Sequence, residues 1–418
     1  METMGTSQEI RHAVTYEGRR APGSFLANAR REAEERGLYD TLVVDMDCHH
    51  YESGHYREIA GYIDNPAIRR VFERYSLPAI QTSIVPGNLG DRNVAGRIRG
   101  EQVEESEHPP GADGMHPVAW SLLRSMDDMA IDYAILFPTP MLVLGVTPQP
   151  ELEVGLARAY NRWLVRNVLP ESDAIKTMLY LPLSDPDASA GFIEEFADAP
   201  GVLGFLVTCV RYQPIHENRF MKVFAALEER SLPLAFHSAP NWGERSFEQM
   251  NRFLGVHALG FPFYAMVQMT NLVYNGIPER FPNIPFVFME AGVAWLPFMV
   301  GRLDNEYRMR SSEAPLLTRM PSDYIRDFHY TSQPIEHFER PEHMQMVLEL
   351  FDGENRLMYS SDYPHQDFDL PSTIADLPCL GEEAKRKVLG GNAARLFGLD
   401  DVKLQDRHPD LLPRQMSR

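Results

Sequence analysis

The sequence lacks the features that would assign it to several specialised classes. It has only 3 cysteines in 418 residues, and none forms a CxxC pair, so neither a disulfide framework nor a cysteine-based zinc cluster is expected. No apolar run approaches the roughly 18 residues that a transmembrane helix needs. The first residues, METMGTSQEIRHAV, carry charges where a signal peptide has an apolar stretch. We therefore predict a cytoplasmic protein that does not span a membrane.

Basic residues are too few for a protein that binds polyanions. The chain has 40 Lys and Arg against 59 Asp and Glu, a formal net charge of -19. This negative charge repels phosphate groups, so we exclude nucleic acid and anionic membranes as partners. We expect metal cations and a small-molecule substrate instead. The motifs GxGxxG after the first strand, GxxxxGK[ST] and GxSxG are also missing. Their absence argues against dinucleotide, P-loop and serine-hydrolase functions.

The sequence does contain a regular alternation of short apolar segments and amphipathic helical segments. The first apolar segment is TLVVDMDCHH, and seven more follow, at 133–140, 174–186, 202–210, 232–240, 284–292, 329–334 and 355–365. Their apolar residues are nearly continuous, as expected for parallel strands that are buried on both faces. Eight strand–helix units predict an α/β fold of the (β/α)8 TIM-barrel type.

The spacing of these segments also predicts the domain organisation. We expect an N-terminal arm over 1–40, a barrel over 41–400 and a C-terminal tail over 401–418. Most of the surplus over a standard barrel separates the first two strands, where the middle of residues 50–130 is rich in Gly, Pro and charge. A loop of this length at the C-terminal face of a barrel is typical of a cap over the substrate.

Polar residues end the first apolar segment, at the position where barrel enzymes carry their active sites. Asp45, Asp47 and His49 alternate along this strand. Because alternate residues of a strand face the same way, we expect all three side chains to point into the barrel mouth. Taken alone, this run fits two metal ligands as well as it fits a buried capping carboxylate beside an exposed imidazole.

Three other strand ends deliver the same kinds of side chain. His237 ends the fifth segment, Glu290 follows the sixth, and Asp362 and His365 follow the eighth. A lone buried His is more often a core residue, but a carboxylate after an apolar run is costly to bury without a cation. The convergence at one rim therefore predicts a metal centre, for which mixed carboxylate and imidazole ligands favour Zn, Mn or Fe. The predicted ligands are Asp47, His49, His237, Glu290 and Asp362.

Two further residues are candidates for substrate binding. Arg211 lies just past the fourth strand and is suited to hold a substrate carboxylate, although surface arginines are common. Trp242 lies just beyond the fifth strand, where an aromatic side chain either lines a pocket or packs against a helix.

The pattern as a whole resembles the amidohydrolase-related family of metal-dependent barrel enzymes, which includes aminocarboxymuconate semialdehyde, resorcylate and carboxyvanillate decarboxylases. The matching motifs are VDMDCHHYE, LAFHSAPNW, SSDYPHQD and the closing GGNAARLFGL. The resemblance implies that Asp47 and His49 replace the family's His-x-His or Glu-x-His pair and that His237 is the fifth-strand ligand. Asp362 then matches the eighth-strand Asp that binds metal and handles a proton. One departure is Glu290, because the family's decarboxylases usually carry a His on the sixth strand.

Two enzymatic functions follow from this resemblance. In the first, one divalent ion such as Zn or Mn activates a water, and the enzyme hydrolyses or decarboxylates a small organic acid or carbonyl substrate. Asp362 and His365 are then the catalytic residues. This function is the one we favour.

The second function uses Glu290 as an additional carboxylate ligand. The pattern is also similar to a non-haem diiron monooxygenase of platensimycin-type diterpenoid biosynthesis that adopts this barrel. That similarity implies two Fe ions, an apolar diterpenoid-like substrate from secondary metabolism, and a reductase or ferredoxin as partner. A non-catalytic metal-binding protein is a third alternative, although no rim ligand is visibly lost. The sequence is compatible with a homo-oligomer.

Overall fold

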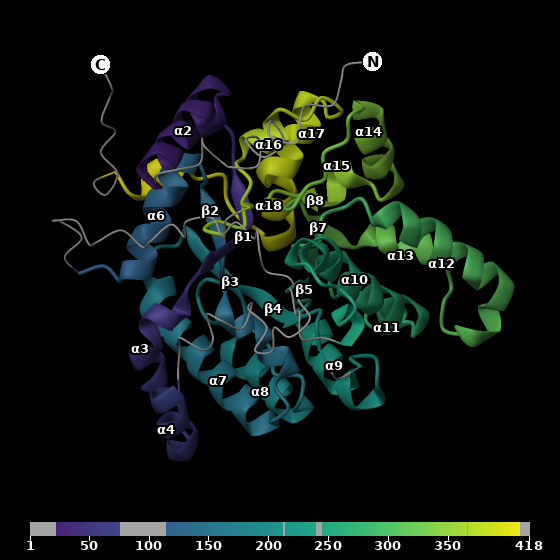
Figure 1. Ribbon diagram of the computed structural model, residues 1–418, viewed down its shortest axis with the longest axis horizontal. Helices are drawn as coiled ribbons and strands as arrows, with labels where there is room; N and C mark the ends of the chain where they lie inside the picture. Colours follow the sequence, from purple (N-terminus) through teal and green to yellow (C-terminus); the bar gives the residue numbers. More distant parts are fainter. Residues whose placement is uncertain (1–21, 76–113, 212–213, 240–244, 366, 410–418) are drawn as a thin grey trace.

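The computed structural model describes residues 22–75, 114–211, 214–239, 245–365 and 367–409 of the chain (Figure 1). The middle of the predicted cap, 76–113, lies outside the described residues, and so does Trp242.

Eight parallel strands form one sheet in sequence order. The first and last strands also meet, because the Met46 N–H donates to the Tyr359 carbonyl at 3.0 Å and the His49 N–H donates to the Tyr363 carbonyl at 2.7 Å. The sheet therefore closes into a barrel surrounded by helices (Figure 1), which confirms the predicted (β/α)8 fold. The strands are β1 (Val44–His50), β2 (Tyr133–Pro138), β3 (Ile175–Tyr180), β4 (Val202–Thr208), β5 (Leu234–His237), β6 (Phe286–Met289), β7 (His329–Thr331) and β8 (Leu357–Met358).

Helices follow the strands and cover the outside of the barrel. The α-helices of the described residues are α2 (Pro22–Glu35), α3 (Tyr56–Ala60), α4 (Pro66–Tyr75), α6 (Pro117–Met129), α7 (Pro150–Trp163), α8 (Pro186–Phe196), α9 (Met221–Glu229), α10 (Phe253–Tyr274), α11 (Ile277–Arg280), α12 (Leu296–Arg310), α13 (Pro321–Asp327), α14 (Pro341–Leu350), α15 (Gly353–Arg356), α16 (Ser372–Ala375), α17 (Glu382–Arg386), α18 (Asn392–Phe397) and α19 (Leu404–Arg407). Three shorter helical turns matter below: η2 (Glu52–His55), η3 (Pro140–Val146) and η9 (Lys387–Gly391). None of these helices combines the length and the apolar character that crossing a bilayer would require.

Several helices begin where the sequence supplies a capping residue. Asp185 caps α8 by accepting hydrogen bonds from the backbone N–H groups of Asp187 and Ala188. His116 caps α6, where its Nδ1 accepts from the Val118 N–H at 3.2 Å. A proline follows each of these caps in the first helical turn, where its missing N–H costs nothing.

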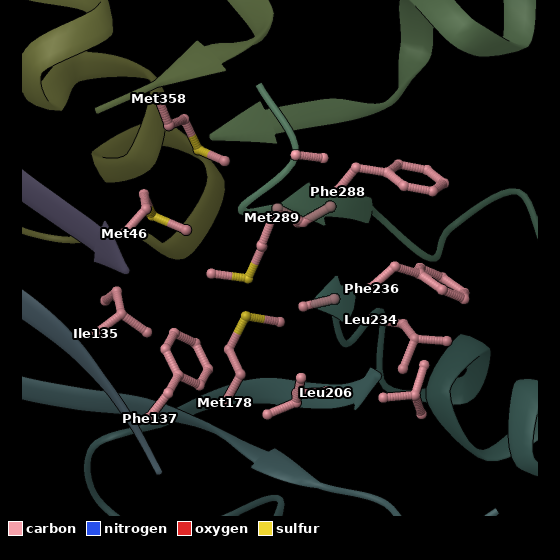
Figure 2. Close-up of a cluster of buried hydrophobic side chains, with 14 of the residues drawn as sticks. Met46, Ile135, Phe137, Met178, Leu206, Leu234, Phe236, Phe288, Met289 and Met358 are labelled. Atoms are coloured by element: carbon pink, nitrogen blue, oxygen red, sulfur yellow. The ribbon is translucent and has the colours of Figure 1, made fainter. Parts of the chain in front are cut away.

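Methionine side chains fill much of the barrel interior. Met46, Met178, Met289 and Met358 come from β1, β3, β6 and β8, and their side chains gather at the centre of Figure 2. Each is at most 1% exposed. In the same view Phe236 points away from this cluster. Because neighbouring strand residues point to opposite faces, the residue after Phe236 faces the barrel interior, and that residue is His237.

Candidate metal centre

The structure brings the five predicted metal ligands to one rim of the barrel. His237 is the last residue of β5, Glu290 directly follows β6, and Asp362 follows β8. All five, including Asp47 and His49 of β1, are at most 5% exposed. The carboxyl ends of parallel strands meet at one face of a barrel, which explains how residues so distant in sequence converge.

The candidate ligand atoms form two groups that share His49. Asp47, His49, His237 and Glu290 form the first, and His49, Asp362 and His365 form the second.

The distances within these groups are short. Asp47 Oδ1 lies 3.1 Å from both His49 Nε2 and His237 Nε2. Asp362 Oδ1 lies 3.3 Å from His49 Nε2, and Glu290 Oε2 lies 3.3 Å from His237 Nδ1. Glu290 therefore points toward the other ligands, so the site is rich in carboxylates.

Backbone carbonyls fix the orientation of the two imidazoles. His49 Nδ1 lies 3.0 Å from the Pro138 carbonyl, and His237 Nδ1 lies 2.6 Å from the Ser238 carbonyl. A carbonyl only accepts hydrogen bonds, so Nδ1 carries a proton in each ring, and Nε2 is left either to donate to a carboxylate when protonated or to bind a metal when neutral.

Both Nε2 atoms face the Asp47 carboxylate, which only accepts hydrogen bonds. Burial would lower the pKa of His237, but the Asp47 charge raises it, so a protonated His237 Nε2 donates to Asp47 Oδ1 at 3.1 Å. A divalent cation between the neutral imidazoles and the carboxylate would take the place of these protons. Among the described residues, His49 Nε2 and Asp47 Oδ2 have no hydrogen-bond partner. The donor set therefore fits a divalent metal, with the backbone carbonyls holding the imidazoles as second-sphere groups do in metalloenzymes.

The carboxylates have strongly perturbed acidities. Burial alone would raise the pKa of Asp47, but His237 and His49 lower it below its usual range. Burial raises the pKa of Glu290 well above its usual value, and the charges of Asp362 and Asp47 raise it further. Burial also raises the pKa of Asp362. Three carboxylates this close cannot all ionise without a compensating cation.

Glu290 and Asp362 reach the site through an unusual backbone conformation. Their φ angles are 54° and 62°, in the left-handed region that residues other than glycine rarely adopt. Met289 already points into the barrel, so regular alternation would turn Glu290 outward. The left-handed turn redirects it, and the Glu290 N–H then donates to Thr331 Oγ1 at 3.0 Å.

One expectation for the first strand is wrong. Asp45 does not join the metal ligands, because the pairing of β1 with β2 shifts register between Asp45 and Cys48 and interrupts the alternation. Asp45 Oδ1 instead accepts hydrogen bonds from the backbone N–H groups of Asp47 and Ser361. Burial raises its pKa to about 7. Asp45 therefore joins the first half of β1 to the segment that follows β8, and does not share the mouth with Asp47 and His49.

His365 forms a hydrogen-bonded chain with residues on both sides. Its Nδ1 lies 2.6 Å from Asp362 Oδ1, and its Nε2 lies 3.1 Å from Thr139 Oγ1. Burial lowers the pKa of His365 to about 4, so the imidazole is neutral near pH 7. The Thr139 N–H in turn donates to Glu52 Oε2 at 3.0 Å. Sequence reasoning missed Thr139, although its place directly after β2 was a usable signal.

Arg211 lies just past β4, and two residues before it the Cys209 N–H donates to the His237 carbonyl at 2.8 Å. Its guanidinium is largely buried, and within the described part of the chain Nε and Nη1 have no hydrogen-bond partner. Burial lowers the pKa of Arg211, although Tyr180 and Glu153 partly offset the effect. The other predicted substrate-binding residue, Trp242, lies outside the described residues.

Comparisons with known proteins point to one family. A family model described as Amidohydrolase matches residues 45–399. The chain is 26% identical to gamma-resorcylate decarboxylase of Rhodococcus jostii over 297 residues, which are 66% of this chain and 87% of the relative. It is 22% identical to 2-amino-3-carboxymuconate-6-semialdehyde decarboxylase of Dictyostelium discoideum over 277 residues, 65% of this chain and 74% of the relative.

Solved structures share the fold. The structure of 5-carboxyvanillate decarboxylase from Sphingomonas paucimobilis matches with a TM-score of 0.61 and 22% identity, covering 86% of this chain and 100% of that one. A dihydroxybenzoic acid decarboxylase from Polaromonas sp. JS666, solved with bound manganese and the inhibitor 2-nitroresorcinol, has a TM-score of 0.60 and 16% identity, covering 87% and 98%. Nothing in these comparisons supports the alternative of oxygen chemistry on two irons.

Proposed function

Because the chain belongs to the amidohydrolase family, with 45–399 matched by the family model, we propose that it is a metal-dependent decarboxylase of a small aromatic acid. The observation that carries this proposal is the buried group of two imidazoles and several carboxylates, in which both Nε2 atoms lie 3.1 Å from Asp47 Oδ1. That donor set suits a divalent cation, and the names of the relatives supply the reaction class.

The chain's own residues would hold the metal at the barrel mouth. Asp47, His49, His237 and Glu290 would be its ligands, and Asp362 would reach the same ion from the side of His49. A bound Mn or Zn would supply a Lewis acid that holds and polarises substrate oxygens. We favour Mn because a related decarboxylase was solved with manganese and because carboxylates suit Mn.

Asp362 and His365 would manage the proton. Loss of a carboxyl group as CO2 breaks a carbon–carbon bond, and the ring carbon must then take a proton in its place. The Asp362 carboxyl would carry that proton and share it with His365 Nδ1, which lies 2.6 Å away. Thr139 holds the far nitrogen of His365, so the ring keeps one orientation while the proton moves.

Arg211 would bind an acidic group of the substrate. Two buried guanidinium nitrogens, Nε and Nη1, have no hydrogen-bond partner within the described residues, which is costly, and a bound carboxylate or phenolate would satisfy them with charge-assisted hydrogen bonds. Its place after β4, beside β5, puts this contact at the same rim as the metal ligands. An aromatic acid anchored by Arg211 therefore fits this half of the mouth.

The deciding experiment compares metals and gases. Metal-free enzyme is reloaded with Mn, Zn or Fe and supplied with 2,6-dihydroxybenzoate or 5-carboxyvanillate, and CO2 release is measured under nitrogen and under air. We expect CO2 release with Mn or Zn at equal rates in both gases, and its loss in Asp362→Asn but not in the surface variant Asp401→Asn. O2 consumption that requires Fe, without CO2 release under nitrogen, would overturn the proposal in favour of an oxygenase.

We also propose a cytoplasmic setting for the enzyme. Its support is the state of the cysteines: Cys48 and Cys209 are buried free thiols, and Cys379 is a partly buried one. Free thiols persist in a reducing compartment.

A further inference from the structure

A second group of potential metal ligands shares no residue with the barrel-mouth centre. His55 belongs to η2, Glu58 to α3, and His116 is the residue that caps α6. One ligand atom from each lies within 4.8 Å of those of the other two. None of the three is used in the function proposed above.

Each imidazole faces a different oxygen of the Glu58 carboxylate, at a distance that suits either a hydrogen bond or a shared ion. His116 Nε2 lies 3.1 Å from Glu58 Oε2, and His55 Nδ1 lies 3.4 Å from Glu58 Oε1. Tetrahedral zinc with bonds of about 2.0–2.1 Å separates its ligand atoms by about 3.3 Å. The ligand atoms of the barrel-mouth centre have the same spacing, 3.1 to 3.3 Å.

The surroundings prepare Glu58 as an anionic ligand. Burial would raise its pKa, but hydrogen bonds from Trp163, His116 and His55 outweigh this effect, so the pKa of Glu58 is lowered. The Trp163 Nε1–H donates to Glu58 Oε2 at 2.9 Å, which is the kind of second-sphere contact that orients a metal-binding carboxylate.

Exposure distinguishes this site from the barrel mouth. His55 is 9% exposed and the His116 side chain 10%, whereas the Glu58 side chain is 47% exposed. An ion at this point would reach solvent on the side of Glu58, which leaves a fourth position for water.

We propose that His55, Glu58 and His116 form a second metal site, selective for Zn2+. Two imidazoles and one carboxylate are a ligand set that zinc uses with water in the fourth position. The ion would join η2, α3 and α6, three elements from both sides of residues 76–113 in the sequence. Zinc at His116 Nε2 moves the ring proton to Nδ1, so the capping bond from the Val118 N–H is given up in exchange for metal ligation.

Two conservative variants test the site. Glu58→Gln keeps the size and an acceptor for Trp163 but loses the charge. His116→Asn keeps a capping side chain, because Asn is among the preferred N-cap residues, but it is too short to reach the ion. His343→Gln removes an exposed imidazole elsewhere and serves as the matched control.

The measurement is zinc content in solution. Metal-free wild type and the three variants are equilibrated with Zn2+ alone, desalted and analysed for zinc per chain. We expect wild type and H343Q to retain one more zinc per chain than E58Q and H116N. Equal zinc content in all four folded proteins would overturn the proposal.

A direct location of the ion covers the case in which a variant fails to fold, as judged by circular dichroism. Wild-type crystals grown with Zn2+ should give an anomalous peak bonded to all three side chains. A map in which the barrel-mouth peak is present and this one is absent would equally overturn the second site.

Discussion

Two carboxylates of the candidate metal centre belong to residues with a strained backbone. Glu290 and Asp362 adopt positive φ angles, a conformation that costs about 1–3 kcal/mol at each residue other than glycine. Hydrogen bonds from neighbouring strand ends maintain it: the Glu290 N–H donates to Thr331 Oγ1, and the Asp362 N–H donates to the Asp47 carbonyl at 2.7 Å. Strain of this kind persists where the surrounding structure over-determines the backbone, as it does at this rim.

Within the described residues, Nε and Nη1 of Arg211 have no hydrogen-bond partner, which leads to one prediction for activity and another for stability. In Arg211→Met, kcat/KM for the acidic substrate should fall about tenfold to a hundredfold, the equivalent of about 1.5–3 kcal/mol for a charge-assisted hydrogen bond. The free energy of unfolding of the free enzyme should not fall, because the lost charge was buried without a hydrogen-bond partner among the described residues.

Steady-state kinetics measure kcat/KM and urea unfolding measures stability, with the exposed Arg219→Met as control. A variant that loses stability and keeps its kcat/KM would show that Arg211 is a structural residue.

The buried Glu52 carboxyl predicts a pH dependence of stability. Burial raises its pKa to about 8. The folded protein therefore keeps a proton that the unfolded chain releases above about pH 4.5, and this group's contribution to stability falls as the pH rises toward 8. Relative to wild type, metal-free Glu52→Gln should gain about 1.4 kcal/mol per pH unit across that window.

Urea unfolding at several pH values measures this difference. Glu342→Gln, at an exposed glutamate, should run parallel to wild type. If the curves of Glu52→Gln and wild type were also parallel, Glu52 would be ionised in the folded protein across the window.

At this scale the sequence predicted residue types better than side-chain directions. His237 was predictable because it ends a regular strand whose alternation holds. Asp45 was not, since a register shift in β1 sends its carboxylate to Ser361. The direction of the Glu290 side chain depends on its left-handed backbone conformation, which no local sequence pattern predicts. The contact of Thr139 with His365 joins two loops 226 residues apart.

Among the elements, η9 shows how closely the last helical segment packs on the barrel. A Cβ added at Gly390 would lie 2.4 Å from the Leu42 carbonyl oxygen, whereas at Gly391 the nearest atom would be at 3.5 Å. Gly390→Ala should therefore destabilise the protein by about 1–3 kcal/mol, because backbone must move to relieve the clash. Gly391→Ala should stabilise it by about 0.4–1 kcal/mol, because alanine loses less chain entropy on folding.

Urea unfolding of the two alanine variants tests this difference, and each serves as the other's control. Equal effects would mean that η9 does not pack on Leu42, two residues before β1, as closely as the structure indicates.

The strands themselves were predictable because parallel strands that are buried on both faces consist of nearly continuous apolar residues. All eight predicted segments contain a strand. Their lengths were overestimated at the end of the chain: β8 comprises only Leu357–Met358, and the rest of that segment turns into the site. Polar residues such as Ser360 and Asp362 lie where the strand pairing of β8 ends and the chain begins to position candidate metal ligands.

On the scale of the whole molecule, the metal centre connects strands from several parts of the barrel. Its candidate ligands come from the ends of β1, β5, β6 and β8, so one ion would bridge segments from both ends of the chain. Binding to the folded state alone raises stability by mass action, and it would also relieve the repulsion among Asp47, Glu290 and Asp362.

Chelation should therefore lower the melting temperature, and Mn2+ should restore it. Differential scanning calorimetry measures the shift. His237→Gln should show a much smaller response to Mn2+, whereas the exposed His343→Gln should behave as wild type. A melting temperature insensitive to chelator in protein that held metal beforehand would contradict this stabilising role.

The methionine cluster at the barrel axis has a consequence for how the protein ages. Met46, Met178, Met289 and Met358 are sealed from solvent, so peroxide reaches their sulfurs only when the barrel opens. Met309 and Met346 are 59% and 53% exposed, so peroxide should oxidise them as fast as it oxidises a freely accessible methionine. The four interior sulfurs would instead be oxidised only when the barrel opens. An oxidised methionine cannot pack back into the barrel, because its polar sulfoxide would be buried among apolar side chains. The amount of methionine sulfoxide at the barrel axis therefore reports how often the barrel has opened, and mass spectrometry can measure it in protein of any age.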